Sequence, residues 1–97
     1  MIDTFAFEFP GGREVAHRAH AGVVASGNCE VLLEPGTAGQ ARVVVRTSVN
    51  GFEGTWGAVL ARFFERHPID VAIEIDDFGA TPAVVTLRLE QALEAAQ

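Results

Sequence analysis

Apolar and polar residues alternate with a period of two in several short stretches of this chain. The first stretch carries Phe5, Phe7 and Phe9 at every second position. This pattern is typical of a half-buried strand whose three rings lie on the core side. The segment Pro10-Gly11-Gly12 follows directly and predicts the end of the strand.

Two apolar stretches enclose a short turn-forming segment and predict a β-hairpin. Ala21 to Val24 form the first arm and Cys29 to Leu33 the second. Between them stands Ala25-Ser26-Gly27-Asn28, and Gly and Asn are the residues that reach positive φ at least cost. We expect a tight turn over these four residues, with Ser26 at its tip.

The middle of the chain predicts two more strands and a helix. Arg42 to Val49 and Val71 to Ile75 alternate as strands do, and a helix between them begins at Thr55 and ends before Pro68, because the residue before proline disfavours helical geometry. The helix has one apolar stripe. Its members are Trp56, Val59, Leu60, Phe63 and His67.

The last segment fits both a strand and a helix, and Thr81-Pro82 decides for the helix. A capping threonine followed by proline at the first helical position is a helix start signal. The tail from Leu89 to Ala96 consists of strong helix formers. The buried stripe of this helix would contain Val85, Leu89, Ala92, Leu93 and Ala96.

The predicted order is therefore β-β-β-β-α-β-α, including a short N-terminal strand. This order predicts an α+β fold in which two helices pack on one face of a mainly antiparallel four-stranded sheet. A chain of 97 residues buries roughly two-thirds of its unfolded surface, which is enough for one core. We expect one domain spanning residues 1–97.

Composition and charge narrow the function classes. The formal charge of -6 at pH 7 repels phosphate backbones, so no nucleic-acid partner is expected. Cys29 is the single cysteine, so an intrachain disulfide is excluded. We see no signal peptide and no apolar run of about 20 residues, so we expect no membrane partner and a cytoplasmic location.

The usual catalytic groups are sparse, and we assign no catalytic residue and no metal ligand. His17 and His20 lie in a segment that reads as extended, with no cysteine or carboxylate at ligand spacing. Asp76 and Asp77 are adjacent in a predicted strand, so they point to opposite faces and fit the capping of a Gly turn better than acid–base work. Cys29 lacks a basic neighbour in sequence, which favours a buried, inert thiol.

Ser26 is the most informative polar residue. It stands at the predicted hairpin tip between Ala25 and Gly27, with no bulky neighbour. Enzymatic modification of a serine needs an exposed hydroxyl on a backbone that can enter another active site. Serine is also common in turns for its own sake, so the pattern alone is compatible with both roles.

Three segments together resemble the acyl carrier subunit family of malonate decarboxylase. They are Ala21–Pro35, Thr47–Gly51, and Asp77–Pro82 with the Val85–Leu89 run after it. The likeness covers nearly the whole chain. Its most specific parts are the Ser-Gly-Asn turn and the Asp-Phe-Gly-Ala-Thr-Pro segment. The citrate lyase acyl carrier subunit is a more distant likeness.

The resemblance implies a non-catalytic carrier with a covalent cofactor. It implies that Ser26 carries 2'-(5''-phosphoribosyl)-3'-dephospho-CoA through a phosphodiester, with Gly27 and Asn28 completing the attachment turn. The implied partners are the prosthetic-group transferase, a malonyl transferase, and the transferase and decarboxylase subunits of the complex. The arm would carry acetyl and malonyl thioesters between them.

Two alternatives come from other classes of protein. A small stand-alone enzyme would use His17 or His20 with Asp76 or Asp77. A plain interaction subunit would use the exposed hairpin for docking alone. If Ser26 were not the attachment site, Ser48 would be the next candidate.

Overall fold

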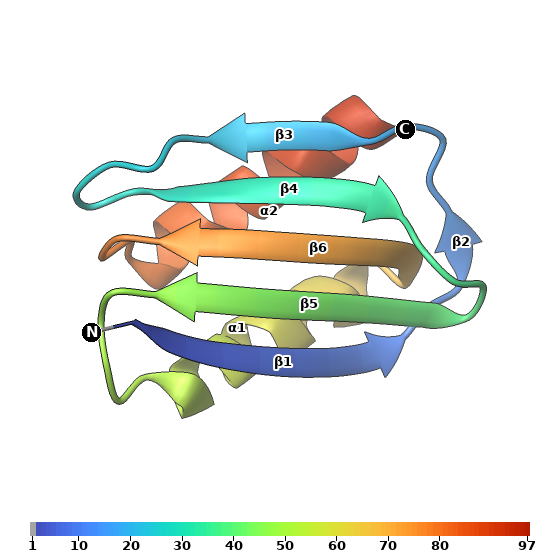
Figure 1. The fold of residues 1–97 in the computed structure, drawn as a ribbon. Helices are drawn as coiled ribbons and strands as arrows, with labels where there is room; N and C mark the ends of the chain where they lie inside the picture. Colours follow the sequence, from blue (N-terminus) through green and yellow to red (C-terminus); the bar gives the residue numbers. More distant parts are fainter. Residues whose placement is uncertain (1) are drawn as a thin grey trace.

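Six strands and two helices make up residues 2–97, the part of the chain that the computed structural model describes (Figure 1). Their order is β1 (Asp3–Pro10), β2 (Arg13–Glu14), β3 (Ala19–Gly22), β4 (Cys29–Pro35), β5 (Gln40–Thr47), α1 (Glu53–Arg66), β6 (Ile69–Asp77) and α2 (Pro82–Ala96).

The strands form a single sheet in the order β1-β5-β6-β4-β3, and the short β2 pairs with β6 outside this path (Figure 1). The pairs β1–β5, β4–β6 and β3–β4 are antiparallel, whereas β5–β6 and β2–β6 are parallel. The longest strand, β6, lies at the centre. Its two neighbours, β5 and β4, are paired with it over most of its length.

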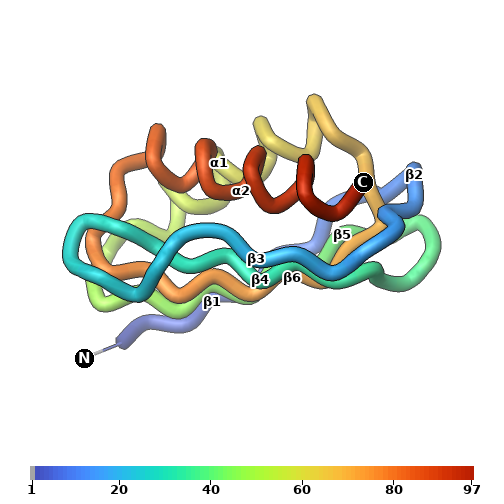
Figure 2. Tube along the Cα trace, turned by 90° about the horizontal axis from the view of Figure 1, so that it is seen from above, coloured from blue at the N-terminus to red at the C-terminus, as the bar shows by residue number. Residues whose placement is uncertain are grey.

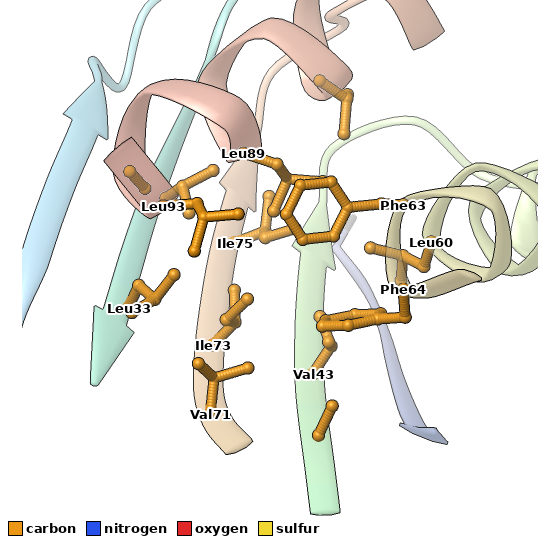
Figure 3. Packing of buried hydrophobic residues seen from close by; sticks show 14 of the residues in the cluster. Leu33, Val43, Leu60, Phe63, Phe64, Val71, Ile73, Ile75, Leu89 and Leu93 are labelled. Carbon is orange, nitrogen blue, oxygen red and sulfur yellow. The ribbon is translucent and has the colours of Figure 1, made fainter. Parts of the chain in front are cut away.

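Both helices cover the same face of the sheet, and the core lies between (Figure 2). Figure 3 shows side chains from α1, among them Phe63 and Phe64, packed beside Leu89 and Leu93 of α2 over the strands. The sheet contributes alternate residues because successive side chains point to opposite faces. Its fully buried members include Val31, Leu33, Val43, Val45, Ile73 and Ile75.

The predicted α+β class and the two helices on one face are confirmed, and two details of the sheet differ. The N-terminal stretch is not a short addition to four strands but an edge strand, β1, paired with β5 from Asp3 to Pro10. Its three phenylalanines are partly buried against the core, as expected of an edge. The pair β5–β6 is parallel because α1 returns the chain across the sheet before β6 begins.

Several predicted boundaries are wrong by two residues, among them the end of β5, which is Thr47 and not Val49. The first hairpin arm ends at Gly22, whose φ of 80° turns the chain out of the sheet, so Val23 and Val24 are exposed instead of paired. Helix α1 begins at Glu53 and not at Thr55, because the Phe52 carbonyl already accepts a hydrogen bond from the Trp56 N–H at 2.9 Å. The Thr55 side chain therefore lies in the first turn and makes no cap.

The helical interpretation of the last segment is confirmed. Thr81 is the N-cap of α2, and its hydroxyl accepts a hydrogen bond from the Val84 N–H at 3.3 Å. Pro82 is the first helical residue. All five residues of the predicted apolar stripe are buried, namely Val85, Leu89, Ala92, Leu93 and Ala96.

The other face of the sheet carries no helix (Figure 2) and is covered by charged side chains. Arg46 of β5 binds both Asp76 and Glu74 of β6, at 2.8 Å and 3.3 Å. Further ion pairs on this face are Arg42–Glu8, His20–Glu30 and Arg18–Glu34. No helix within residues 2–97 is long and apolar enough to cross a bilayer.

Candidate functional site

Ser26 lies in the loop of residues 23–28, which joins β3 to β4 at the end of the sheet where β5 and β6 also finish (Figure 1). The Asn28 N–H donates to the Ala25 carbonyl at 3.0 Å, which closes a β-turn over residues 25–28. Gly27, in the third position of the turn, has a φ of 75°, as a type II turn requires. Ser26, in the second position, is exposed. The predicted turn is confirmed, and Gly27 alone supplies its positive φ.

Two backbone hydrogen bonds fasten this loop to the connection between β6 and α2. The Gly27 N–H donates to the Phe78 carbonyl at 2.7 Å, and the Phe78 N–H donates to the Asn28 carbonyl at 3.0 Å. The loop therefore continues the pairing of β4 with β6 by a further step. Both of these hydrogen bonds join main-chain atoms only, so they do not depend on which side chains the turn carries.

The Asn28 side chain adds a second brace. Its Oδ1 accepts hydrogen bonds from the Cys29 N–H at 2.8 Å and from Nε of Arg88 at 3.2 Å. Arg88 is held in turn by Gln91, one turn further along α2, at 2.9 Å. Asn28 does not adopt a positive φ. Its contribution to the turn is the pair of hydrogen bonds that its amide oxygen accepts. A helix far away in sequence holds the turn in place.

Asp77 organises the end of β6 beneath this loop. It is 3% exposed, and its Oδ2 accepts a hydrogen bond from the Thr47 hydroxyl at 2.8 Å. Its two oxygens also accept from the N–H groups of Gly79 and Ala80, at 3.2 Å and 3.0 Å. Asp77 therefore caps the Gly turn, as its sequence context predicted. Asp76 points to the open face and binds Arg46, so the two carboxylates do not converge.

Cys29 is fully buried beside Asp77. The pKa of its thiol is raised to about 11, mainly by burial and also by the Asp77 carboxylate, with the Arg88 guanidinium opposing the rise. A thiol with this pKa is protonated at neutral pH and is a weak nucleophile. The predicted buried position of Cys29 is confirmed.

The histidines lie apart from both aspartates. His20 Nε2 lies 3.0 Å from Glu30 on the open face, and His17 is exposed, with its backbone N–H on the Ala96 carbonyl. Within residues 2–97 neither histidine forms a hydrogen bond with Asp76 or Asp77, and no three potential metal ligands lie together. The residues proposed for a stand-alone enzyme are therefore not assembled into one site.

A cavity of about 270 Å³ lies next to this loop, between the first turns of α1 and α2. Trp56 and Val59 of α1 and Val85 of α2 form its apolar walls. Val49 and Phe52, both exposed, also line it. This cavity forms where two helices distant in the chain meet, so no local sequence pattern predicts it.

Three residues of the site were missed from sequence. Thr47 lies within a predicted strand, but its bond to Asp77 depends on the parallel pairing of β5 with β6. Arg88 lies between Leu87 and Leu89 of α2, and its bond to Asn28 depends on the fold. Phe78 acts through its backbone and leaves no signal in its side chain.

The fold and this site define the class: a small α+β domain with an exposed loop that backbone hydrogen bonds fasten to the sheet, an arrangement that suits a carrier domain. Comparison with known proteins makes the class specific. The family model described as malonate decarboxylase delta subunit (MdcD) matches residues 16–96. The chain belongs to this family.

Individual relatives agree over almost the full length. The chain is 52% identical to the malonate decarboxylase acyl carrier protein of Pseudomonas fluorescens (strain Pf0-1), covering 96% of this chain and 95% of the relative. It is 51% identical to that of Azotobacter vinelandii, with the same coverage. A chain in the crystal structure of a Pseudomonas malonate decarboxylase hetero-tetramer, in complex with malonate, has 48% identity and a TM-score of 0.93, covering 98% of this chain and 99% of that one.

Proposed function

We propose that this chain is the acyl carrier subunit of a malonate decarboxylase and that Ser26 is the residue that carries its prosthetic group, 2'-(5''-phosphoribosyl)-3'-dephospho-CoA. One observation carries the assignment of the residue. Ser26 presents an exposed hydroxyl at the tip of a turn whose backbone is fixed to the neighbouring strand connection. Family membership supports the assignment of the function.

The surroundings of Ser26 fit a large group linked through a phosphodiester. A Cβ placed on Gly27 would meet no atom within 4 Å, so the space beside the serine is open to an attaching enzyme. Arg88 is held on Asn28 of the same turn and brings a positive charge to an otherwise acidic chain. A guanidinium near the loop favours a phosphate there by charge.

The chain's own part in the chemistry is limited to presenting an oxygen atom. On attachment, the Ser26 hydroxyl would lose its proton to a base of the attaching enzyme. The Oγ would form a new bond to phosphorus, and the activated donor would release its leaving group. The bound group supplies a terminal thiol that holds the acyl group as a thioester.

A rigid domain with a single tether suits transfer between partner active sites. A tether turns encounters between separate proteins into intramolecular ones and raises the effective concentration without any catalytic group on the carrier. We infer that the partners are the transferase and decarboxylase subunits, the malonyl transferase and the prosthetic-group transferase, in the cytoplasm. The likeness to a chain of the Pseudomonas hetero-tetramer supports this assembly.

Intact mass of the carrier tests the assignment. Protein co-expressed with its prosthetic-group transferase should exceed the sequence mass by one prosthetic group, and Ser26→Ala should abolish the increment. Ser48→Ala is the matched control, because Ser48 is also an exposed serine at this end of the sheet. An increment that survives Ser26→Ala and is lost in Ser48→Ala would move the attachment site to Ser48.

The same variants separate the two alternative classes. A plain docking subunit predicts that the complex containing Ser26→Ala keeps its malonate decarboxylase activity. A stand-alone enzyme predicts turnover by the isolated, unmodified chain, lost on His20→Ala. The carrier proposal predicts no turnover by the isolated chain and loss of complex activity in Ser26→Ala.

A further inference from the structure

The cavity between α1 and α2 has walls suited to a small uncharged ligand. Val59 and Val85 face it beside Trp56, whose side chain is only 6% exposed. Its charged member, Asp77, already accepts hydrogen bonds from Thr47, Gly79 and Ala80. The cavity therefore offers apolar contact and no free charge.

This cavity adjoins the turn that carries Ser26. Gly79 and Ala80 line it, and a Cβ placed on Gly79 would lie 3.9 Å from the backbone nitrogen of Gly27. The hydrogen bond from Gly27 to Phe78 holds the turn and the cavity wall together. A group tethered to Ser26 therefore starts next to the cavity.

We propose that this cavity binds the acetyl thioester end of the arm attached to Ser26, which returns to its own carrier between transfers. The inference rests on the proposed function and adds a ligand site within the domain. The acetyl form is the resting form in this scheme. Its thioester lies against Trp56 and Val59 and is partly shielded from bulk water.

Size and polarity fit this ligand. An apolar cavity of about 150 Å³ can hold benzene, so a cavity of about 270 Å³ has room for an acetyl thioester and the adjoining methylene groups. A malonyl thioester ends in a carboxylate, which would lose its hydration among apolar walls and lie near the Asp77 carboxylate. The cavity thus discriminates in favour of the acetyl form.

The tether makes even weak binding effective. A flexible link of this kind gives a local concentration on the order of millimolar. A cavity that binds the free thioester with a dissociation constant of about 1 mM would then be occupied about half of the time. Affinity of this order also lets the arm leave for a partner active site.

A chemically attached arm tests the inference without the attaching enzyme. The S26C variant is coupled to maleimide-linked S-acetylpantetheine, and Cys29 does not compete because it is fully buried with a raised pKa. Trp56 is the single tryptophan, and the chain has no tyrosine, so its fluorescence reports on the cavity alone. We expect acrylamide quenching of Trp56 to fall about twofold, and thioester hydrolysis to slow about twofold relative to free S-acetylpantetheine.

Two matched variants and a charged arm decide the outcome. Ala80→Leu fills the cavity and should abolish both effects, whereas Ala83→Leu, an exposed position of α2 outside the lining, should preserve them. The inference is overturned if the two variants behave alike, if an S-malonyl arm gives an equal response, or if quenching changes only when partner subunits are added. A natural mass increment that persists in Ser26→Ala would contradict the proposed role of Ser26 and would leave this result unaffected.

Discussion

The central strand β6 has a buried aspartate at each end, and the two ends use the same chemistry for different purposes. Asp70, at the start of the strand, and Asp77, at its finish, are each 3% exposed. Asp70 Oδ1 accepts hydrogen bonds from the N–H groups of Gly12 and Gly39, at 2.8 Å and 3.0 Å. Each carboxylate therefore accepts hydrogen bonds from backbone N–H groups of loops, which have no neighbouring strand to pair with.

The loops around the two carboxylates differ in the space they leave. Near Asp70, a Cβ on Gly11 would collide with the carboxylate itself, and a Cβ on Gly36 would come within 2.6 Å of the Val71 backbone. Near Asp77, Gly27 and Gly51 have no atom within 4 Å of a Cβ position. Both ends have a hollow, one lined by Asp70 and the other by Asp77. They differ at their glycines, because backbone packs against Gly11 and Gly36 at the first end, whereas the turn at Gly27 is open at the second.

The largest expected effect comes from removing either carboxylate. Asp70→Ala and Asp77→Ala each leave buried donors without a partner, which should cost about 3 kcal/mol of unfolding free energy. Urea unfolding measures both losses. Only Asp77→Ala should also increase acrylamide quenching of Trp56 and slow the loading of Ser26. Equal effects of the two variants on loading would contradict a special role of the Asp77 end of the sheet in presenting Ser26.

Glycine substitutions sharpen the contrast in packing. Gly11→Ala forces a methyl group into the Asp70 carboxylate and should cost about 2 to 3 kcal/mol. Gly27→Ala meets no atom, but its φ of 75° is strained for alanine, so we expect about 1 kcal/mol. Chemical denaturation of both variants checks the order. A reversed order would show that the turn at Ser26 is the more tightly packed one.

Alkaline pH should lower the unfolding free energy through the buried thiol of Cys29. The pKa of its thiol is about 11 in the folded chain against 9.0 in the unfolded chain, so the unfolded state loses this proton first. Stability is therefore fully present below pH 9 and falls as pH rises toward 11, by about 1 kcal/mol at pH 10. Cys29→Ala should remove this part of the pH dependence. An unchanged pH profile in the variant would assign the loss to other groups.

The smallest effect is expected at the side-chain brace. Arg88→Ala removes one hydrogen bond to Asn28 and should cost about 1 kcal/mol or less, because the backbone bonds to Phe78 remain. Hydrogen exchange at the Gly27 and Asn28 amides should accelerate more than exchange at Gly39. Arg18→Ala, an exposed ion-pair residue on the open face, serves as the control. Faster exchange at Gly39 alone would refute the brace.

Periodicity predicted most of the elements because each has a well-defined buried face. The stripe on α2 and the alternation in β6 are local patterns, and both were read correctly. The failures lie where the determinant is not local. The start of α1 depends on the Phe52 carbonyl, and the end of β3 on the φ of Gly22.

The turn at Ser26 could be predicted from sequence, whereas the contacts that hold this turn in place could not. Ser26 and Gly27 stand in a sequence with recognisable turn chemistry, and family resemblance gave the serine a role. The contacts of Asn28 with Arg88, and of Gly27 with Phe78, join positions about 50 to 60 residues apart in the chain. Such contacts, and the cavity beside them, depend on the order of strands in the sheet.

The two backbone hydrogen bonds between the Ser26 turn and Phe78 have a geometric consequence for any assembly that contains this domain. Because Gly27 and Asn28 are fastened to the sheet, an arm attached to Ser26 as proposed would have a fixed pivot, and its free end would sweep a sphere around that point. Active sites served by a stationary domain must all open within one arm's length of the pivot. Sites further apart than twice that length would oblige the whole domain to travel.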